Sequence, residues 1–370
     1  MGHVRHLYVH LPFCAHRCGY CDFVTVVGRN GQHDSYVDAL LTELDLQRGV
    51  LADDVDTVFL GGGTPTFTEP AALARLLAAL PAADEVTVEA NPETVTPELA
   101  ELLLTNGVNR VSLGAQSFEP RLLEVLERQA SPDDVRGAVR TLRTAGFDNV
   151  SLDLIYGIPG QSEDDLDADL AEALALEPEH LSCYELEAKP GTRFTHAHGA
   201  ELERQGDAME GYFELVVETL TVAGYRWYET ANFCRTGAWD LRAQHNLGYW
   251  RGRDYLGVGV GAVSTVAGSR RRNVASLPRY VAALAGGETS PCELEPIDSG
   301  THAREVLMLG LRLDEPVVLA GVAEAVDHDA LARLAASGLV ELTANGRGDE
   351  LRLTPRGRSL GDAVTADLIA

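Results

Sequence analysis

The chain has 370 residues, of which 45% are hydrophobic, and 30 basic against 56 acidic side chains give it a formal net charge of -26. The length predicts two domains, or two with a small third, and the composition excludes collagen-like, coiled-coil and disordered classes. Such a negative charge repels phosphates, so no nucleic-acid partner is expected.

Targeting signals are absent from the sequence pattern. The longest weakly polar stretch, 256–268, is too short to cross a bilayer. Residues 1–13 lack the apolar run and small-residue cleavage site of a secretory signal. We therefore expect a cytoplasmic protein with no transmembrane segment, which leaves peripheral contact with a membrane open.

The first half of the chain alternates β-rich apolar runs with segments of helical periodicity. Six such units without an order reversal predict a partial (β/α)6 barrel rather than a doubly wound sheet, with the chemistry at the carboxyl ends of the strands. The expected strands are 7–9, 57–60, 86–89, 110–114, 150–155 and 181–185, and the expected helices are 34–51, 70–80, 97–106, 120–128, 132–145 and 163–176.

The second half has a different texture. The pattern breaks after Glu187, at 189–191 and 196–199, before an expected helix at 207–223 and an aromatic segment at 225–228. Near Asp298, expected helices at 301–311, 319–325 and 329–337 precede a hairpin of 339–343 and 350–354 around Asn345-Gly346. This end resembles a winged helix, which we interpret as structural rather than DNA-reading. The predicted domains are a barrel at 1–190, an extension at 191–297 and a smaller α+β C-terminal domain at 298–370.

Three of the six cysteines, Cys14, Cys18 and Cys21, fall within eight residues after the first expected strand. Packing does not explain such a cluster. Tetrahedral zinc needs a fourth ligand, and a redox pair of Cys18 and Cys21 leaves Cys14 unexplained. A 4Fe-4S cubane held by three thiolates uses all three and leaves one iron open. The isolated Cys183, Cys234 and Cys292 are expected to be small buried hydrophobes.

Two glycine-rich segments invite opposite interpretations. Gly61-Gly62-Gly63-Thr64-Pro65 ends the second expected strand, where glycines let the backbone approach a ligand closely; the alternative is a plain turn. It lacks the Gly-Lys-Ser/Thr of a phosphate-binding loop. Gly257-x-Gly259-x-Gly261 has no flanking strand, helix and acid of a dinucleotide site, so we expect a tight structural turn.

The Cys-x3-Cys-x2-Cys spacing after the first strand of a barrel resembles the radical S-adenosylmethionine (radical SAM) superfamily. Within it, the chain resembles the subgroup of oxygen-independent coproporphyrinogen III dehydrogenase (HemN-like) and HemW-type heme chaperones, a likeness that covers nearly the whole chain. The motifs that carry it are Tyr8-Val-His-Leu-Pro-Phe-Cys14, Glu89-Ala-Asn-Pro92, Ser112-Leu-Gly-Ala-Gln116-Ser-Phe118, Asp153-Leu-Ile-Tyr-Gly157-Ile-Pro159 and His245-Asn246-Leu-Gly-Tyr249-Trp250.

The resemblance implies a set of cofactor contacts and no residue that acts as a catalytic acid or base. The open iron would chelate SAM, with Gly61 alongside and Tyr8, Gly62 and Glu89 as contacts. Gln116 and Arg128 have an alternative as an internal hydrogen bond and a helix-surface charge, and Glu185 stands where the dehydrogenase has Ala. The positions that match a second SAM in the dehydrogenase are Tyr20, Gly63, Thr64, Gln116, Arg128 and Asp153.

Three features favour the chaperone branch: Phe23 where the dehydrogenase has a fourth cysteine, only 13 residues before Cys14, and the motif that begins at His245. Imidazole is a common axial ligand of heme iron, so His245 is the candidate heme ligand, with a hydrogen-bonding structural role as the alternative. Related chains tend to have the tripeptide Gly-Ala-His after this motif. This chain has Gly261-Ala262-Val263 there, so the histidine is replaced by valine. The heme propionates need a basic spot, for which the candidates are Arg251, Arg253 and Arg270-Arg271-Arg272, the last of these being otherwise a solvated turn.

The sequence therefore predicts a heme chaperone that binds a 4Fe-4S cluster, SAM and heme, passes heme to an acceptor hemoprotein, and takes electrons from a reductant such as ferredoxin or flavodoxin. Two alternatives stay open. One is a coproporphyrinogen III dehydrogenase of porphyrin biosynthesis, which would make the chain an enzyme. The other is a radical SAM class C methyltransferase.

Overall fold

The computed structural model describes residues 3–369 except 29, 188, 190–192 and 346–347. A nine-stranded sheet has the order β11-β1-β4-β5-β6-β7-β8-β10-β9, parallel from β11 to β8 and antiparallel at β10 and β9. Its strands are β1 (His6–Leu11), β4 (Val55–Gly62), β5 (Ala83–Ala90), β6 (Arg110–Gln116), β7 (Val150–Tyr156), β8 (His180–Glu185), β9 (Tyr225–Glu229), β10 (Asn232–Arg235) and β11 (Leu256–Val258).

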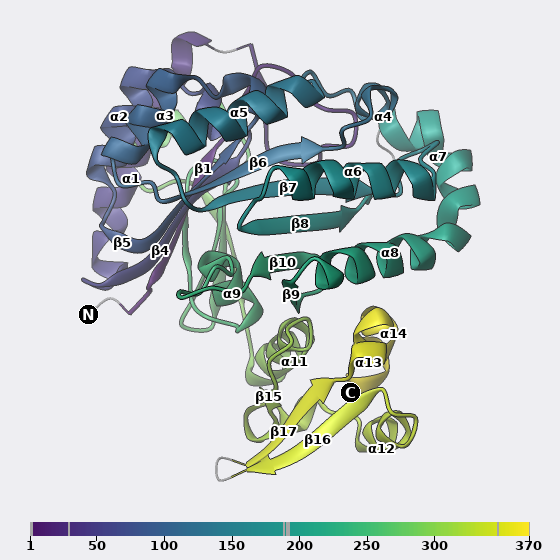
Figure 1. Cartoon of the computed structure of the whole chain (residues 1–370). Helices are drawn as coiled ribbons and strands as arrows, with labels where there is room; N and C mark the ends of the chain where they lie inside the picture. Colours follow the sequence, from purple (N-terminus) through teal and green to yellow (C-terminus); the bar gives the residue numbers. More distant parts are fainter. Residues whose placement is uncertain (1–2, 29, 188, 190–192, 346–347, 370) are drawn as a thin grey trace.

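Helices of the βα units cover the outer face of this sheet, so the predicted partial barrel is confirmed (Figure 1). Proline in the first turn starts several of them, because its missing N–H is unpaired there anyway. Capping boxes at Ser131 and Ser162 start two. The helices are α1 (His33–Gln47), α2 (Pro70–Ala79), α3 (Pro97–Thr105), α4 (Pro120–Val125), α5 (Pro132–Ala145) and α6 (Glu163–Ala175).

The segment expected as a separate extension contributes β9, β10 and β11 to the main sheet, and its buried side chains join the barrel core. A helix that the sequence pattern missed, α7 (Arg193–Gln205), covers the break expected at 196–199, while residues 190–191 of the break expected at 189–191 fall outside the described residues. The arginine run 270–272, expected as a turn, is a strand. The remaining elements are α8 (Met209–Val222), α9 (Gln244–Trp250), β12 (Val263–Val266), β13 (Ser269–Asn273), α10 (Leu277–Ala285) and β14 (Cys292–Pro296).

One buried carboxylate on α1 holds this late segment against the barrel. Glu43 accepts hydrogen bonds from Gly259 N at 2.8 Å, Tyr280 OH at 2.6 Å and Asn273 Nδ2 at 2.8 Å. The expected turn at 257–261 begins inside β11, where a Cβ on Gly257 would lie 2.0 Å from the carbonyl oxygen of Val263. These glycines therefore serve close backbone packing rather than a ligand.

The C-terminal domain has a hydrophobic cluster of its own and lies beside the edge strand β9 (Figure 1). The winged-helix-like arrangement appears, but the helix expected at 319–325 is wrong: two 3-10 turns meet at Val322, whose φ of -134° is not helical. Gly346 of the expected hairpin turn lies outside the described residues. The elements are α11 (Ser299–Gly310), β15 (Val317–Val318), α12 (His328–Ala336), β16 (Val340–Asn345), β17 (Gly348–Leu353), α13 (Pro355–Ser359) and α14 (Gly361–Leu368).

The division into three independently folding domains stays a prediction.

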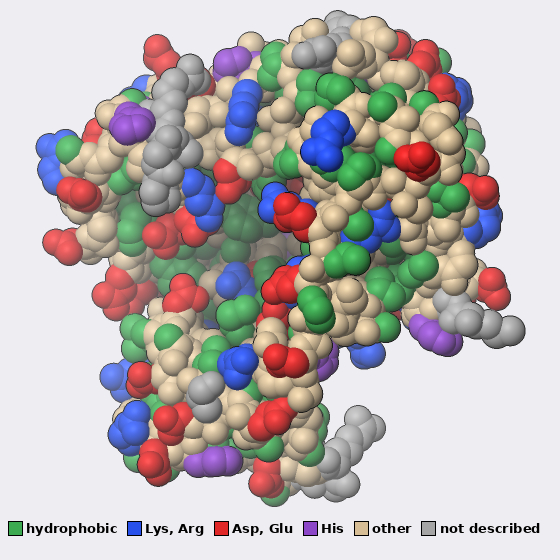
Figure 2. Space-filling view, turned by 180° about the vertical axis from the view of Figure 1, so that it is seen from behind, with side chains coloured by type: hydrophobic (Ala, Val, Ile, Leu, Met, Phe, Trp, Pro, Cys, Tyr) green, Lys and Arg blue, Asp and Glu red, His purple; other side chains and the backbone are tan. Residues whose placement is uncertain are grey.

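On the face turned away in Figure 1, the molecule is hollowed above the C-terminal domain, with hydrophobic side chains inside and charged ones around the rim (Figure 2). Within the described part of the chain, no helix is both long and apolar enough to traverse a lipid bilayer.

Candidate cofactor site

The three clustered cysteines lie on the loop that follows β1. Two short strands, β2 (Phe13–Cys14) and β3 (Val26–Val27), pair in parallel and close this loop at its base. Val26 N donates to Pro12 O at 2.8 Å, and Thr64 N, from the loop after β4, donates to Phe13 O at 2.8 Å. Cys14 is buried, with 8% of its surface exposed, while Cys18 and Cys21 are half-buried. The carboxyl ends of β1 and β4 therefore fix where the loop begins and ends.

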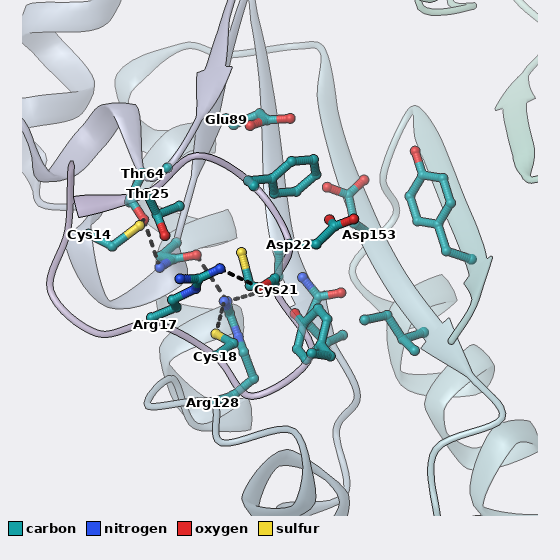
Figure 3. A pocket seen from close by; sticks show the side chains of 18 of the residues that line it. Cys14, Arg17, Cys18, Cys21, Asp22, Thr25, Thr64, Glu89, Arg128 and Asp153 are labelled. Carbon is teal, nitrogen blue, oxygen red and sulfur yellow. Dashed lines mark hydrogen bonds between the residues drawn. The ribbon is translucent and has the colours of Figure 1, made fainter. Parts of the chain in front are cut away.

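Two donors approach the sulfur atoms. Thr64 Oγ1 donates to Cys14 Sγ at 3.5 Å, and Arg128 Nη1 donates to Cys18 Sγ at 3.6 Å (Figure 3). Burial raises the pKa of the Cys14 and Cys21 thiols, because it disfavours the charged thiolate. A bound metal centre would reverse that preference, because its ligands are thiolates.

The arrangement of the thiols bears on which metal centre they could hold. Among the described residues, no group of three or more His, Cys, Asp or Glu side chains converges on a position for one metal ion. A tetrahedral zinc site needs such convergence. A cubane takes each thiolate on a different iron, so its sulfurs stand apart around one wall of a cavity. The donor set of three thiols facing one cavity fits a cluster better than a single ion.

A cavity of about 450 Å³ lies above these cysteines, at the carboxyl ends of β4 to β8. Tyr8 and Gly61 lie next to this cavity rather than in its lining, and His245 lies elsewhere. The predicted site residues that line it are Cys14, Cys18, Tyr20, Cys21, Gly62, Gly63, Thr64, Glu89, Gln116, Arg128 and Asp153.

Two half-buried acids face the cavity across from the cysteine loop (Figure 3). Glu89 accepts a hydrogen bond from Gly62 N at 3.1 Å, and Asp153 accepts from Ser112 Oγ at 3.2 Å. Burial, and then the nearby Asp153 carboxylate, raise the pKa of Glu89 to about 7. Burial also raises the pKa of Asp153. The pair can receive a cationic group such as an ammonium, which would relieve both costs.

The three glycines of the loop after β4 each stand where a side chain would collide. A Cβ on Gly61 would lie 2.8 Å from Glu89 Oε2, and one on Gly63 would lie 2.6 Å from the carbonyl carbon of Pro12. Gly62 has φ of +108°, and its Cβ would lie 2.3 Å from the His10 ring. The loop is thus a close-approach segment that brings backbone N–H groups to the cavity.

Arg128 is not a helix-surface charge. Its Nη2 donates to Gly114 O at 2.8 Å and to Asn91 Oδ1 at 3.0 Å, and Asn91 Nδ2 donates to Thr64 Oγ1 at 3.2 Å. These bonds form a chain from Arg128 to Thr64 and on to Cys14. The sequence pattern indicated no role for Asn91, although the Glu89-Ala-Asn-Pro92 motif contained it.

Gln116 lies at an irregularity of the β6–β7 pairing and has φ of +66°. A residue other than glycine rarely adopts this conformation, and such strain concentrates at functional sites. Its side chain reaches the cavity, where a Cβ on Gly114 would lie 2.7 Å from its Nε2.

His245 lies at the opposite end of the barrel, with 1% of its surface exposed. Its Nδ1 is 2.7 Å from Thr57 Oγ1 and its Nε2 is 2.9 Å from Tyr249 OH, so both ring nitrogens are hydrogen-bonded. Glu85, another residue that the sequence pattern missed, accepts from His245 N at 3.0 Å and from Gln244 N at 2.9 Å, which caps α9. Burial lowers the pKa of His245 to about 3. In this conformation the geometry supports the structural alternative and offers no nitrogen to a heme iron.

Most arginines expected near heme propionates already have carboxylate partners. Arg251 Nη2 lies 2.8 Å from Glu315, and Arg270 Nη2 lies 2.7 Å from Glu305. Arg253 makes no ion pair with a described residue.

Among the isolated cysteines, Cys183 and Cys234 are buried as expected, but Cys292 is exposed on β14, because that strand is exposed throughout.

Comparisons with known proteins agree with this site. Residues 8–173 match the Radical SAM superfamily, and residues 297–360 match the HemN C-terminal domain. Heme chaperone HemW of Mycobacterium tuberculosis is 38% identical over 98% of this chain and 94% of its own, and HemW of Bacillus subtilis is 32% identical over 98% of each. The coproporphyrinogen III oxidase HemN of Escherichia coli, a radical SAM enzyme, superposes with a TM-score of 0.80 at 24% identity, covering 99% of this chain and 90% of that one.

Proposed function

Because the chain belongs to the heme chaperone HemW family of radical SAM proteins, we propose that it binds heme and delivers it to acceptor hemoproteins. The observation that carries the proposal is the match to heme chaperones along almost the whole length of both chains. The likeness to HemN, at 24% identity, supports the fold alone. Heme, an acceptor hemoprotein and a reductant such as ferredoxin or flavodoxin are the partners of this proposal. We place it in the cytoplasm, where thiols stay reduced.

In this proposal Cys14, Cys18 and Cys21 hold a 4Fe-4S cluster through one thiolate each. The chemistry that such a cluster would supply there is one-electron reduction of SAM. Thr64 and Arg128 donate hydrogen bonds to two of the sulfurs and so stabilise the thiolate forms.

The wall across the cavity would hold SAM. Glu89, which the Gly62 N–H holds in place, would receive its polar end, and Gly61 and Gly63 keep the backbone close enough for that contact. Tyr8 would support this wall from behind, because its hydroxyl lies 3.0 Å from His10 Nδ1. The walls and the half-buried acids exclude bulk water from the open iron.

The positions that match a second SAM split into two groups. All six line the cavity, but one group is Arg128, which already uses its Nη2 for Asn91 and Gly114, and the other is Tyr20, Gly63, Thr64, Gln116 and Asp153. We propose that Arg128 supports the cluster loop instead of a second cofactor. Phe23, 63% exposed at the cavity rim, places an apolar ring where the dehydrogenase has a cysteine. No contact among the described residues favours the other alternative, a methyltransferase.

Anaerobic reconstitution followed by two parallel assays tests the proposal. The protein should bind about four irons per chain, bind hemin, and transfer it to an apo-hemoprotein, while reduced protein with SAM forms no protoporphyrinogen IX from coproporphyrinogen III. Repeated turnover to that product, or an absence of hemin binding, would refute the chaperone function. An unchanged electron paramagnetic resonance spectrum at saturating SAM would refute the SAM site.

A further inference from the structure

A second cavity, of about 330 Å³, lies between α9 and α11, the first helix of the C-terminal domain, away from the cysteine loop. We call it the α9–α11 crevice, and define it by the residues Tyr249, Trp250, Tyr255, His302, Val306 and Leu309. Apart from His302, these walls are aromatic or aliphatic, which suits a flat apolar ligand.

The aromatic wall is held in place by the barrel. The rings of Tyr249 and Tyr255 meet edge to face with centroids 4.6 Å apart. The hydroxyl of Tyr249 is fixed by His245 Nε2, and the Trp250 indole packs under the guanidinium of Arg312, 4.6 Å from its ring centre. The Tyr249 and Trp250 side chains are thus held in place before a ligand binds, which reduces the entropy cost of binding.

The opposite wall carries an accessible imidazole. His302 is exposed on α11, one turn before Val306, and its imidazole makes no hydrogen bond or ion pair with any described residue. It therefore differs from His245, whose two nitrogens are both bonded. An accessible imidazole beside an apolar slot has the features of a heme axial ligand.

The charges at the rim suit an anionic ligand edge. Two arginines and two acids line the rim: Arg270 neutralises the Glu305 carboxylate at 2.7 Å, Arg253 makes no ion pair with a described residue, and the Asp254 carboxylate accepts a hydrogen bond from Ala267 N at 2.9 Å. In a chain with a net charge of -26, this leaves a local spot where propionates avoid repulsion.

We propose that the α9–α11 crevice is the heme-docking site, with His302 as the axial iron ligand and Arg253 beside the propionates. The inference rests on the proposed heme-chaperone function and adds a site to it. His245 is then a positioning residue that acts through Tyr249.

Hemin titration of the full-length protein, followed at the Soret band, tests this site. His302→Ala should weaken hemin binding about tenfold and shift the band, and added imidazole should restore the wild-type spectrum, because it can occupy the vacated iron position. Val306→Trp should weaken binding with or without imidazole, because it fills the crevice. His328→Ala, an exposed histidine on α12 of the same domain, is the matched control and should behave as wild type.

The outcomes separate this inference from the proposed function. Wild-type protein that binds no hemin would refute both. Wild-type binding with an unchanged spectrum and affinity in His302→Ala would refute the crevice alone. A band lost only in His245→Ala and restored there by imidazole would also overturn it, because it would make His245 the ligand.

Discussion

At the mouth of the barrel, Glu89 and Asp153 lie half-buried on β5 and β7 without an ion-pair partner among the described residues, and Gln116 and Gly62 take strained or glycine-only conformations. At the other end, His245 is fully buried, and its ring nitrogens and backbone N–H all have partners on Thr57, Tyr249 and Glu85. Both ends belong to one sheet and one hydrophobic core.

The difference indicates which end of the barrel binds a ligand. Unpaired half-buried acids cost free energy that a bound cation can recover, whereas a satisfied network needs nothing more. Substitutions of the cysteines and acids at the mouth should therefore change cofactor binding more than stability, with the opposite effect at the other end.

The largest expected effect is the loss of the metal centre. A variant with Cys14, Cys18 and Cys21 all changed to Ala should lose all bound iron and its visible absorbance after reconstitution, because no thiolate remains at the mouth. Iron analysis measures this, and Cys292→Ala, which removes an exposed cysteine on β14, is the control. Iron retained by the triple variant would show that the ligands lie elsewhere.

Gly62→Ala should destabilise the mouth strongly. It adds a steric clash with the His10 ring to the strain of a positive φ, and His10 cannot move aside because its nitrogens bond Tyr8 and Val24. Gly287 has φ of +75°, and no described atom lies within 4 Å of the position that a Cβ would take, so Gly287→Ala should cost only about 1 kcal/mol. Chemical denaturation should show about 2–4 kcal/mol for Gly62→Ala; equal losses in the two variants would mean that His10 yields.

His245→Ala tests the satisfied end. It removes two hydrogen bonds and a stacking partner of Phe59, so it should lower the free energy of unfolding by about 2–4 kcal/mol while iron content stays unchanged. The pKa of folded His245, about 3, is below its ordinary 6.5, so its stabilisation is full above pH 6.5 and falls as pH drops toward 3. The loss of stability between pH 7 and pH 5 should therefore be smaller in His245→Ala. An equal loss in the variant would contradict the burial of a neutral ring.

Glu89→Gln should have the smallest and opposite effect on stability. Because the pKa of folded Glu89 is raised from 4.5 to about 7, its ionisation costs stability as pH rises through that range. The variant should gain about 2 kcal/mol over wild type at pH 8 and nothing at pH 4. It should also lose SAM binding, measured by calorimetry on the reconstituted protein. A variant that binds SAM normally would remove Glu89 from the site.

The βα half of the fold could be predicted because proline, serine caps and short apolar runs act locally. Strand β11 could not, because its partner β1 lies about 250 positions earlier and the pairing leaves no local pattern. Glu43 and Glu85 occur in segments whose charges would normally be solvated, and only the assembled structure shows that they bind distant N–H groups.

The site divides in the same way. Spacing singled out the cysteines and the glycine loop, because their chemistry needs those residues close together in sequence. The positions of Arg128 and Asn91 depend on three different strands and could not be derived from spacing. His245 was identified through its motif, but its burial against Thr57 and Tyr249 depends on how α9 packs under the sheet.

The position of β1 between β4 and β11 also constrains the order of events during synthesis. β1 leaves the ribosome about 250 residues before its partner β11, so one of its edges stays unpaired until Val258 has emerged, and the bonds of Glu43 to Asn273 and Tyr280 form later still. The nascent chain therefore carries three reactive thiols next to an open strand edge for much of translation. We expect cluster insertion to follow the emergence of β11 and Tyr280, so cells short of reductant during synthesis should accumulate apoprotein with oxidised cysteines.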